Sequence, residues 1–279
     1  MKDKTEKDRD GTVDRLTLPL FVPGDRPERF AKAMGAGADA VIVDLEDAVA
    51  PDAKAGARAG LERALAPLAG TGPVLLRINA SGTPWHADDL AACTGLPLAG
   101  IVLPKAETGG DCLAVSQATG LPVVALVESA RGLRTAEEIA RASVRIASGS
   151  IDFAADLGIA HERDVLLPAR FALAMAARLA GQAAPIDGVT TALREEDVIA
   201  DDCRHAVAVG FGGKLLIHPA QIAAARKGFA PSEGECDWAR RVLAAVEGGA
   251  AAIAVDGAMV DAPVIARARR ILERAAATV

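Results

Sequence analysis

The sequence has 279 residues, of which 51% are hydrophobic and 24% are charged, and its formal net charge is −6. Disordered chains lack this much apolar material, and a chain of this length can bury a core without disulfides or structural metals. An excess of acids, with 3% aromatic residues and no tyrosine, argues against a nucleic-acid-binding protein, which needs a basic surface or stacking aromatics. The composition predicts a folded protein with another kind of ligand.

The N-terminal residues, the cysteines and the uncharged stretches indicate the cellular compartment that we expect for the protein. Eight of the first ten residues are charged, so we expect residues 1–14 to form a disordered tail and not a secretory signal. The four cysteines are far apart and follow no CxxC or Cys/His metal spacing, which favours a reducing environment. The longest uncharged stretches contain Gly and Pro and are too short for a membrane span. We therefore expect a cytoplasmic protein.

Eight short apolar runs rich in Val, Ile and Leu recur along the chain. The runs are Leu16–Val22, Ala40–Asp44, Val74–Ile78, Gly100–Leu103, Val123–Val127, Val144–Ala147, Pro185–Ile186 and Lys214–Ile217. Most are continuous, not alternating, which is typical of parallel strands buried on both faces. The longer segments between them favour helices. Eight successive βα units predict an α/β fold, a TIM-type (β/α)8 barrel over residues 15–225, in preference to a doubly wound sheet.

Two helical patterns lie outside this strand series. Phe171, Met175 and Leu179 recur every four residues, and we expect this stripe to face the core. After the eighth run, Ala239–Val246 and Pro263–Ala276 are predicted to be helical, with a turn or short strand at Ile253–Asp256. Residues 226–279 would then be a C-terminal helical extension that reaches a neighbouring subunit.

Polar residues follow the runs, whereas Gly, Ala and Pro mostly precede them. In a barrel the carboxyl ends of all strands meet at one mouth, which is where active sites lie. Several acids around one mouth repel one another unless they share a cation. Without clustered Cys or His, the ligands suit Mg²⁺ or Mn²⁺ better than zinc.

Glu128 and Asp152, which follow consecutive runs, are the expected metal pair. Two plainer interpretations stay open. Asp152 can be the N-cap of the next helix, and Glu128 can form a salt bridge with Arg131 or Arg134.

Arg77 stands among apolar residues, so it must be paired or face a substrate. It can clamp a carboxylate or stabilise an oxyanion, and it can also form a buried ion pair with Glu46 or Asp47. Lys105 offers a Schiff base as a less favoured route to carbon–carbon cleavage. His218 is either a base or a structural hydrogen-bond partner.

Ordered motifs from about residue 15 to residue 275 resemble the citrate lyase beta-subunit-like family of the HpcH/HpaI aldolase and malyl-CoA lyase superfamily. The motifs include Leu20–Pro27, Asp44–Val49, Leu76–Asn79, Pro104–Glu107, Val127–Ala130, Asp152–Gly158, Ala184–Val189, Gly210–Lys214, Ile217–Ile222 and Val255–Asp261. The resemblance implies a TIM-like barrel that assembles as homotrimers or hexamers. It also implies Mg²⁺ bound by Glu128 and Asp152.

The resemblance assigns further roles. Arg77 would bind substrate and polarise a thioester or keto oxygen. Independently of these roles, we also expect Glu46 to be a catalytic residue. Asp261 would enter from a neighbouring subunit as an acid/base.

Four more residues are expected to contact the substrate or coenzyme A: Arg26, Arg29, Lys105 and Pro219. The chain departs from the family at Ile151, where many members have an acid, at Ser148, where many have Phe, and at Asp25, where Asn is frequent.

The sequence therefore predicts a Mg²⁺-dependent lyase. It would cleave a malyl-, citramalyl- or citryl-CoA-type thioester to acetyl-CoA and a 2-oxo acid, or condense them. One alternative is a metal-dependent aldolase acting on a 2-keto acid without coenzyme A, and another is a non-catalytic acyl-CoA-binding subunit. The acyl group, the direction, the carrier of the thioester and any thioester hydrolysis stay open.

Overall fold

The computed structural model describes residues 12–247 and 254–278, and the chain divides into two compact units, residues 1–225 and 226–279. Each unit is considered by itself. Within the described ranges, no helix has both the length and the apolarity that crossing a membrane requires.

The first unit is a barrel of eight parallel strands that pair in chain order. The strands are β1 (Pro19–Pro23), β2 (Ala40–Asp44), β3 (Val74–Arg77), β4 (Gly100–Leu103), β5 (Val123–Val127), β6 (Arg145–Ser148), β7 (Ile186–Asp187) and β8 (Gly213–Lys214). The ring closes where the amide of Leu216 donates to Pro19 and the amide of Phe21 donates to Leu216, both at 2.9 Å. The predicted TIM-type barrel is confirmed, and three strands have the predicted bounds.

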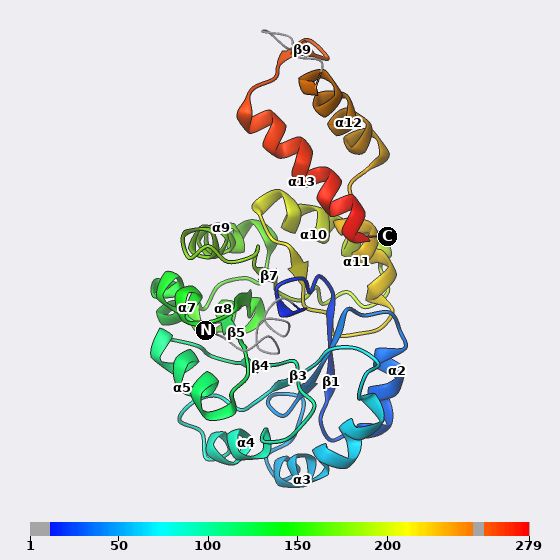
Figure 1. Cartoon of the computed structure of the whole chain (residues 1–279). Helices are drawn as coiled ribbons and strands as arrows, with labels where there is room; N and C mark the ends of the chain where they lie inside the picture. The colour runs from blue at the N-terminus through cyan, green and yellow to red at the C-terminus, as the bar shows by residue number, and fades with distance from the viewer. Residues whose placement is uncertain (1–11, 248–253, 279) are drawn as a thin grey trace. The chain divides into compact units, whose positions relative to one another are not determined.

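Helices surround these strands (Figure 1). They are η1 (Pro27–Arg29), α2 (Phe30–Met34), α3 (Lys54–Leu65), η2 (Ala66–Leu68), α4 (His86–Ala92), α5 (Gly109–Thr119), α6 (Ala130–Arg134), α7 (Ala136–Ala142), α8 (Ser150–Leu157), α9 (Arg163–Leu179), α10 (Glu196–Val209) and α11 (Gln221–Phe229). Because helices cover the outside and side chains fill the inside, strand residues are buried on both faces, which explains the continuous apolar runs.

The amino-terminal segment packs against the barrel interior. Val13 and Leu16 belong to one buried cluster with strand residues such as Leu75 and Val124. The guanidinium of Arg145 donates to the carbonyl oxygens of Val13 and Leu16. The expected disordered tail is therefore wrong at residues 12–14, and the rest of that tail lies outside the described residues.

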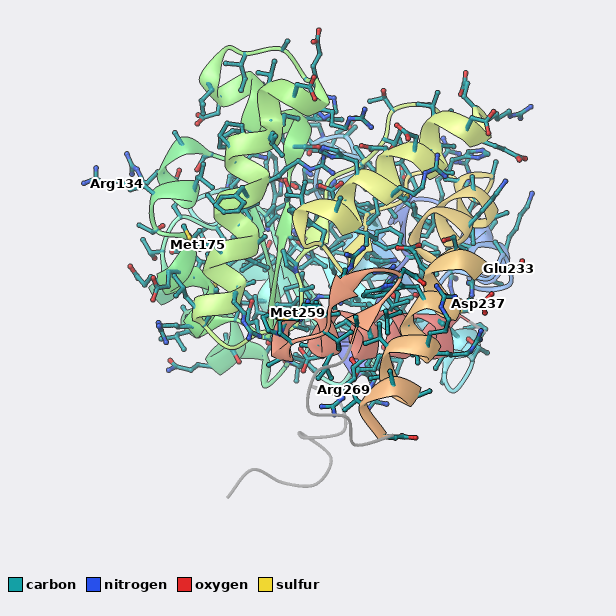
Figure 2. All side chains as sticks on the ribbon, turned by 90° about the horizontal axis from the view of Figure 1, so that it is seen from above. Arg134, Met175, Glu233, Asp237, Met259 and Arg269 are labelled. Carbon is teal, nitrogen blue, oxygen red and sulfur yellow. The ribbon has the colours of Figure 1, made fainter. Side chains whose placement is uncertain are left out.

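The stripe on α9 faces away from the core, so that prediction is wrong. Phe171, Met175 and Leu179 are 61%, 50% and 54% exposed, and Met175 projects from the outer surface of its helix (Figure 2). The buried face instead carries Leu173 and Arg170. A spacing of four residues is compatible with either face. Here the face with a charge turns inward because Arg170 finds a buried carboxylate.

The second unit is a helical hairpin. Helix α12 (Glu233–Glu247) packs on α13 (Ala262–Thr278) around a small apolar cluster. Two short antiparallel strands, β9 (Ala254–Val255) and β10 (Ala258–Met259), are joined by Asp256 and Gly257. Both turn residues have positive φ angles, 53° and 78°, as a type I′ turn requires. Both predicted helices are present, and Ile253 of the predicted turn lies outside the described residues.

A buried ionic cluster joins β7, β8, α9 and α10. Asp187 accepts hydrogen bonds from Arg170 and from the Nζ of Lys214, the latter at 2.9 Å. Lys214 also lies 2.7 Å from Asp202. Burial lowers the pKa of the Lys214 ammonium, but the charges of Asp187 and Asp202 outweigh it, so the pKa is raised. The charges compensate one another, which is what allows their burial.

Removing one member of this cluster leaves a buried carboxylate without its main partner. We predict that Lys214→Met lowers the free energy of unfolding by about 3–5 kcal/mol, measured by urea denaturation. Arg204→Met removes an exposed ion pair with Asp201 and should change the unfolding free energy by less than about 1 kcal/mol. Equal effects of the two changes would contradict the account.

Candidate active site

Charged side chains from the carboxyl ends of neighbouring strands meet in one cavity of ≈ 390 Å³. We call it the acidic cavity after its charged lining residues, which are Asp44, Asp47, Arg77, Glu128 and Asp152. Asp44 ends β2 and Arg77 ends β3, and the strand register places the two opposite each other. The barrel therefore brings together the predicted residues Arg77, Glu128 and Asp152.

Arg77 is fixed by acids on three sides. Its Nε and Nη2 donate to the two oxygens of Asp44 at 2.7 Å, and its Nη1 lies 3.1 Å from Glu46 and 3.7 Å from Asp47. The ring of Phe21 lies 4.7 Å from the guanidinium. Burial lowers the pKa of Arg77, but its hydrogen bonds to Asp44 outweigh this and raise it. Arg77 is thus a permanent cation held in one orientation.

The predicted ion pairs of Arg77 with Glu46 and Asp47 are present, but its main partner is Asp44, which is not among the predicted partners. The pairing of Asp44 with Arg77 could have been predicted from the sequence. Asp44 and Arg77 each end a predicted strand, and the strands are consecutive, so parallel register sets them side by side.

Glu46 links two cations. One of its oxygens accepts from the Nζ of Lys105 at 2.7 Å, and the other lies near Arg77. Lys54 holds the loop by donating to the carbonyl oxygens of Leu45 and Glu46 at 2.8 Å. Burial raises the pKa of Glu46, although both cations oppose the shift. Glu46, in the loop after β2, therefore positions Arg77 at the end of β3 and Lys105 after β4.

Lys105 holds Glu128 through its backbone. Its φ angle is 49°, a left-handed conformation that costs a side-chain-bearing residue about 1–2 kcal/mol. In that conformation its amide donates to Oε1 of Glu128 at 2.7 Å. Lys105 is thus placed beside the site by its backbone, and its ammonium is paired with Glu46.

Gly149 makes room for Glu128. A Cβ atom on Gly149 would overlap the carboxylate of Glu128, so only glycine allows Glu128 to occupy this position. Sequence reasoning missed Gly149. Its position in the polar segment that follows the sixth apolar run was the available signal, since a glycine there permits close approach of backbone to a functional group.

Neither plainer interpretation of the acidic pair holds. Glu128 accepts from Lys105 and not from Arg131, which pairs with Glu107. Asp152 lies inside the first turn of α8, whose N-cap is Gly149. In the described part of the chain, neither Asp152 nor Oε2 of Glu128 accepts a hydrogen bond.

This donor set fits Mg²⁺. Burial, and then the negative charges of Glu46 and Asp152, raise the pKa of Glu128 to about 8, so the site has an excess of negative charge that a cation would offset. Across residues 12–247 and 254–278, no cluster of three or more His, Cys, Asp or Glu is suited to a metal. Mg²⁺ needs only one or two protein carboxylates and fills its other positions with water and substrate oxygens.

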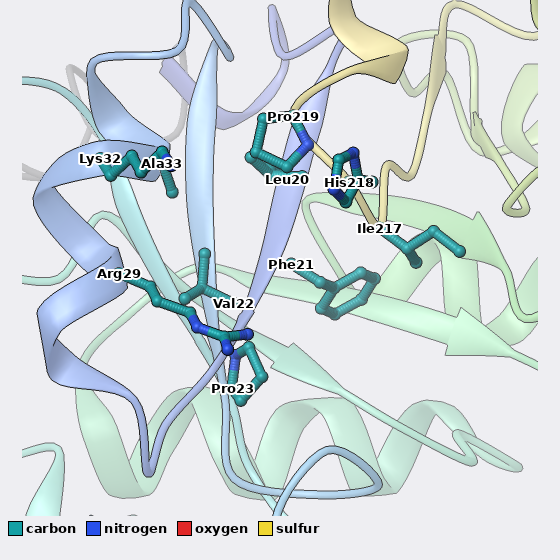
Figure 3. A pocket seen from close by; sticks show the side chains of 10 residues that line it. All are labelled: Leu20, Phe21, Val22, Pro23, Arg29, Lys32, Ala33, Ile217, His218 and Pro219. Carbon is teal, nitrogen blue, oxygen red and sulfur yellow. The ribbon is translucent and has the colours of Figure 1, made fainter. Parts of the chain in front are cut away.

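A second cavity of ≈ 390 Å³ adjoins the first, and we call it the basic cavity after Arg29 and Lys32 in its lining. Figure 3 shows these two side chains on one side and Ile217, His218 and Pro219 on the other. Phe21, Pro23 and Ile217 line both cavities.

Of the residues predicted to contact coenzyme A, Arg29 and Pro219 line the basic cavity. Arg26 lies in neither lining and is exposed, 3.9 Å from Asp25. Lys32 was missed, although it follows Arg29 by three residues and so shares its helical face. His218 accepts from the amide of Ala220 at 3.1 Å, which is the structural role.

Asp261 belongs to the second unit, whereas the other predicted site residues belong to the first. It is exposed and precedes α13, where its Oδ1 accepts from the amide of Val264 at 3.1 Å. Within the first unit, Arg77, Glu128 and Asp152 line the acidic cavity, and Glu46 and Lys105 contact them. Arg29 and Pro219 line the basic cavity, whereas Arg26 lines neither.

Three comparisons with known proteins agree. The family model described as HpcH/HpaI aldolase/citrate lyase matches residues 17–219. A citrate lyase subunit beta-like protein of Mycobacterium tuberculosis is 42% identical over 265 residues, which cover 92% of this chain and 94% of that protein. A (3S)-malyl-CoA thioesterase of Cereibacter sphaeroides is 37% identical, with 92% and 94% covered.

Among solved structures, CitE from Mycobacterium tuberculosis in complex with magnesium, acetoacetate and coenzyme A is similar at a TM-score of 0.82 and 38% identity. The match covers 94% of this chain and 99% of that one. Fold and sequence thus point to the same relatives.

The raised pKa of Glu128 predicts how stability depends on pH in metal-free protein. Between its ordinary value of 4.5 and about 8, the folded state binds more protons than the unfolded state, so the free energy of unfolding falls as pH rises. The contribution of the raised Glu128 pKa to the free energy of unfolding is complete below pH 4.5 and is lost as pH rises through about 8.

We expect the difference in melting temperature between wild type and Glu128→Gln to change steadily over this range, measured in a chelating buffer. Glutamine cannot ionise, so the melting temperature of the variant should increase relative to that of wild type as pH rises. A difference that is constant with pH would show that Glu128 titrates normally.

Proposed function

Because the chain belongs to the HpcH/HpaI aldolase/citrate lyase family, we propose that it is a Mg²⁺-dependent carbon–carbon lyase. Its substrate is a malyl-, citramalyl- or citryl-CoA-type thioester, which it cleaves to acetyl-CoA and a 2-oxo acid or forms by the reverse condensation. One observation carries the proposal. Glu128, Asp152 and Arg77 line a single cavity, and that cavity adjoins another lined by Arg29 and Lys32.

Glu128 and Asp152 hold the metal. When bound, Mg²⁺ supplies a positive charge that polarises the keto oxygen of the 2-oxo acid. Glu128 is kept in place by the amide of Lys105 and by contact with Gly149, and a ligand fixed in this way loses little freedom on binding.

Arg77 stabilises negative charge on the reacting oxygens. Its position is fixed before substrate arrives, because Asp44 binds it through two hydrogen bonds. A preorganised cation stabilises a developing oxyanion without the cost of reorienting at the moment of reaction.

The basic cavity binds the coenzyme A part of the substrate. Arg29 and Lys32 are exposed and offer two positive charges to its phosphates. The thioester then passes Phe21, Pro23 and Ile217, which border both cavities, to reach Arg77.

In the condensing direction, Asp261 of a neighbouring subunit removes the proton alpha to the thioester. The resulting enolate carbon forms a bond to the keto carbon of the 2-oxo acid, and the alkoxide oxygen takes up a proton. Cleavage runs the same steps in reverse, so that the bond breaks and the enolate regains its proton.

We further propose that the protein assembles as a homotrimer or hexamer, with residues 226–279 reaching a neighbour. The exposed apolar stripe of α9 supports association, because monomeric proteins rarely expose such patches. We place the protein in the cytoplasm, which agrees with four buried cysteines that form no disulfide.

The function is tested by product analysis. The full-length protein, Mg²⁺ and acetyl-CoA or propionyl-CoA are incubated with a panel of 2-oxo acids, and adducts are identified by mass spectrometry. We expect one class of adduct with wild type and at least a hundredfold lower rate with Glu128→Gln, because a metal ligand is lost. Glu137→Gln, an exposed change on α7, should retain wild-type activity.

Other outcomes would identify a different function. Condensation of free aldehydes with 2-oxo acids but not with acyl-CoA would indicate a coenzyme A-independent aldolase. Binding of acyl-CoA without any product would indicate a non-catalytic subunit. Release of free thiol from the adduct would add thioester hydrolysis, the activity for which the Cereibacter sphaeroides relative is named.

Sharing of the site between subunits predicts complementation. Glu128→Gln and Asp261→Asn should each be inactive alone. When the two variants are co-expressed and form mixed oligomers, about a quarter of the sites combine an intact barrel with an intact Asp261 from the neighbour. We therefore expect about a quarter of the wild-type activity, measured by adduct formation. Inactive mixtures, with mixed oligomers confirmed by mass spectrometry, would place Asp261 outside the shared site.

A further inference from the structure

We infer that the exposed face of α9 binds the same face of a second copy of this chain, with the two helices antiparallel and related by a two-fold axis at Phe171. Such a contact joins copies in pairs, so it rests on the proposed assembly and deepens it by selecting the hexamer over the trimer. It needs neither metal nor substrate. Phe171 and the residues around it line neither the acidic cavity nor the basic cavity.

The centre of this face is apolar. Four large side chains, each four residues from the next, are exposed on α9: Leu167, Phe171, Met175 and Leu179 are 39%, 61%, 50% and 54% exposed. Because α-helices have 3.6 residues per turn, a step of four residues rotates by only about 40°, so these side chains form one stripe. The residues that α9 buries lie on its opposite side. A continuous exposed apolar stripe of this kind marks an interaction site.

The stripe has a negative charge at one end and a positive charge at the other. Asp164 lies seven residues before Phe171, and Arg178 lies seven residues after it. Seven residues are nearly two turns, so both charges lie within about 20° of Phe171 around the helix and about 10 Å from it along the axis. Both are exposed, and among the described residues neither side chain has an ion-pair or hydrogen-bond partner. Arg163, at the edge of this face, is paired with Asp201.

This arrangement of charges and apolar side chains is complementary to itself. When two copies of α9 pack antiparallel about Phe171, positions equally far from Phe171 on its two sides face each other. Leu167 then packs on Met175, and Asp164 meets Arg178, with each contact made twice, as a two-fold interface requires. Parallel helices would instead place Asp164 against Asp164 and Arg178 against Arg178, which lowers affinity. The charges therefore favour a second copy as the partner and specify its direction.

The length of the helix bears on how strong the contact is. Helix α9 has 17 residues and is therefore about 25 Å long. A single pair of helices of this length covers less area than a standard interface of about 1,600 Å², so a contact between two isolated copies would be weak. Two trimers meet through three such contacts at once, and contacts linked in this way strengthen one another.

Analytical ultracentrifugation of the full-length protein, without metal or substrate, tests the contact. Wild type should sediment as a particle of six copies that dissociates into two halves on dilution. Phe171→Asp places two acids face to face on the two-fold axis, and we expect it to raise the dissociation constant of the halves at least about tenfold. Leu113→Asp is the matched control, because Leu113 on α5 is also 50% exposed, and it should leave this constant unchanged.

Reversal of the end charges identifies the partner. Asp164→Arg and Arg178→Asp each set like charges opposite one another, so each should weaken pairing at least about tenfold. The double variant exchanges the two signs and should recover the dissociation constant of wild type. An equimolar mixture of the two single variants should also pair, since each copy then meets the opposite charges on the other. Recovery shows that the variants fold, and it requires a partner that carries both positions.

Several results would overturn the inference. A wild-type particle with an odd number of copies would do so and would leave the proposed trimer standing, whereas a monomer would refute both. If Phe171→Asp has no effect, or if exchanging the charges gives no recovery, another segment covers α9, such as residues 226–279 of a neighbour. Formation of adducts from acyl-CoA is measured separately, so failure of this contact and failure of the proposed lyase are distinguishable.

Discussion

Repulsion among carboxylates is the constraint on which the site depends. Asp44, Glu46, Glu128 and Asp152 approach one mouth of the barrel, and their burial together is tolerable only with cations placed between them. Arg77 and Lys105 offset the charge on the side of β2 and β3. Glu128 and Asp152 are left uncompensated, and the pKa of Glu128 rises to about 8. The excess negative charge is confined to the place where we propose that the metal binds.

The backbone rather than other side chains fixes Glu128, the proposed metal ligand. Lys105 adopts a left-handed conformation that directs its amide to Glu128, and Gly149 leaves the space that Glu128 occupies. Strained or side-chain-free positions of this kind persist where the surrounding structure overdetermines them. Loops on a rigid barrel provide this support, because each loop starts from a strand held by neighbours on both sides.

The sequence by itself determined the barrel and the general composition of the site. Continuous apolar runs located all eight strands, since burial on both faces removes the alternation of a half-exposed strand. Polar residues after those runs identified Arg77, Glu128 and Asp152, because parallel strands bring their carboxyl ends to one edge. These properties depend on local patterns and on one general rule of topology.

Only the tertiary structure decided which groups pair and which face is buried. The stripe of Phe171 and Met175 has the spacing of a core face, yet Arg170 is buried because Asp187, seventeen positions along the chain, accepts its hydrogen bond. Likewise, Glu46 is bound by Lys105, and Gly149 is required only by its contact with Glu128. Such pairings depend on distances between residues far apart in sequence, and periodicity in one segment carries no information about them.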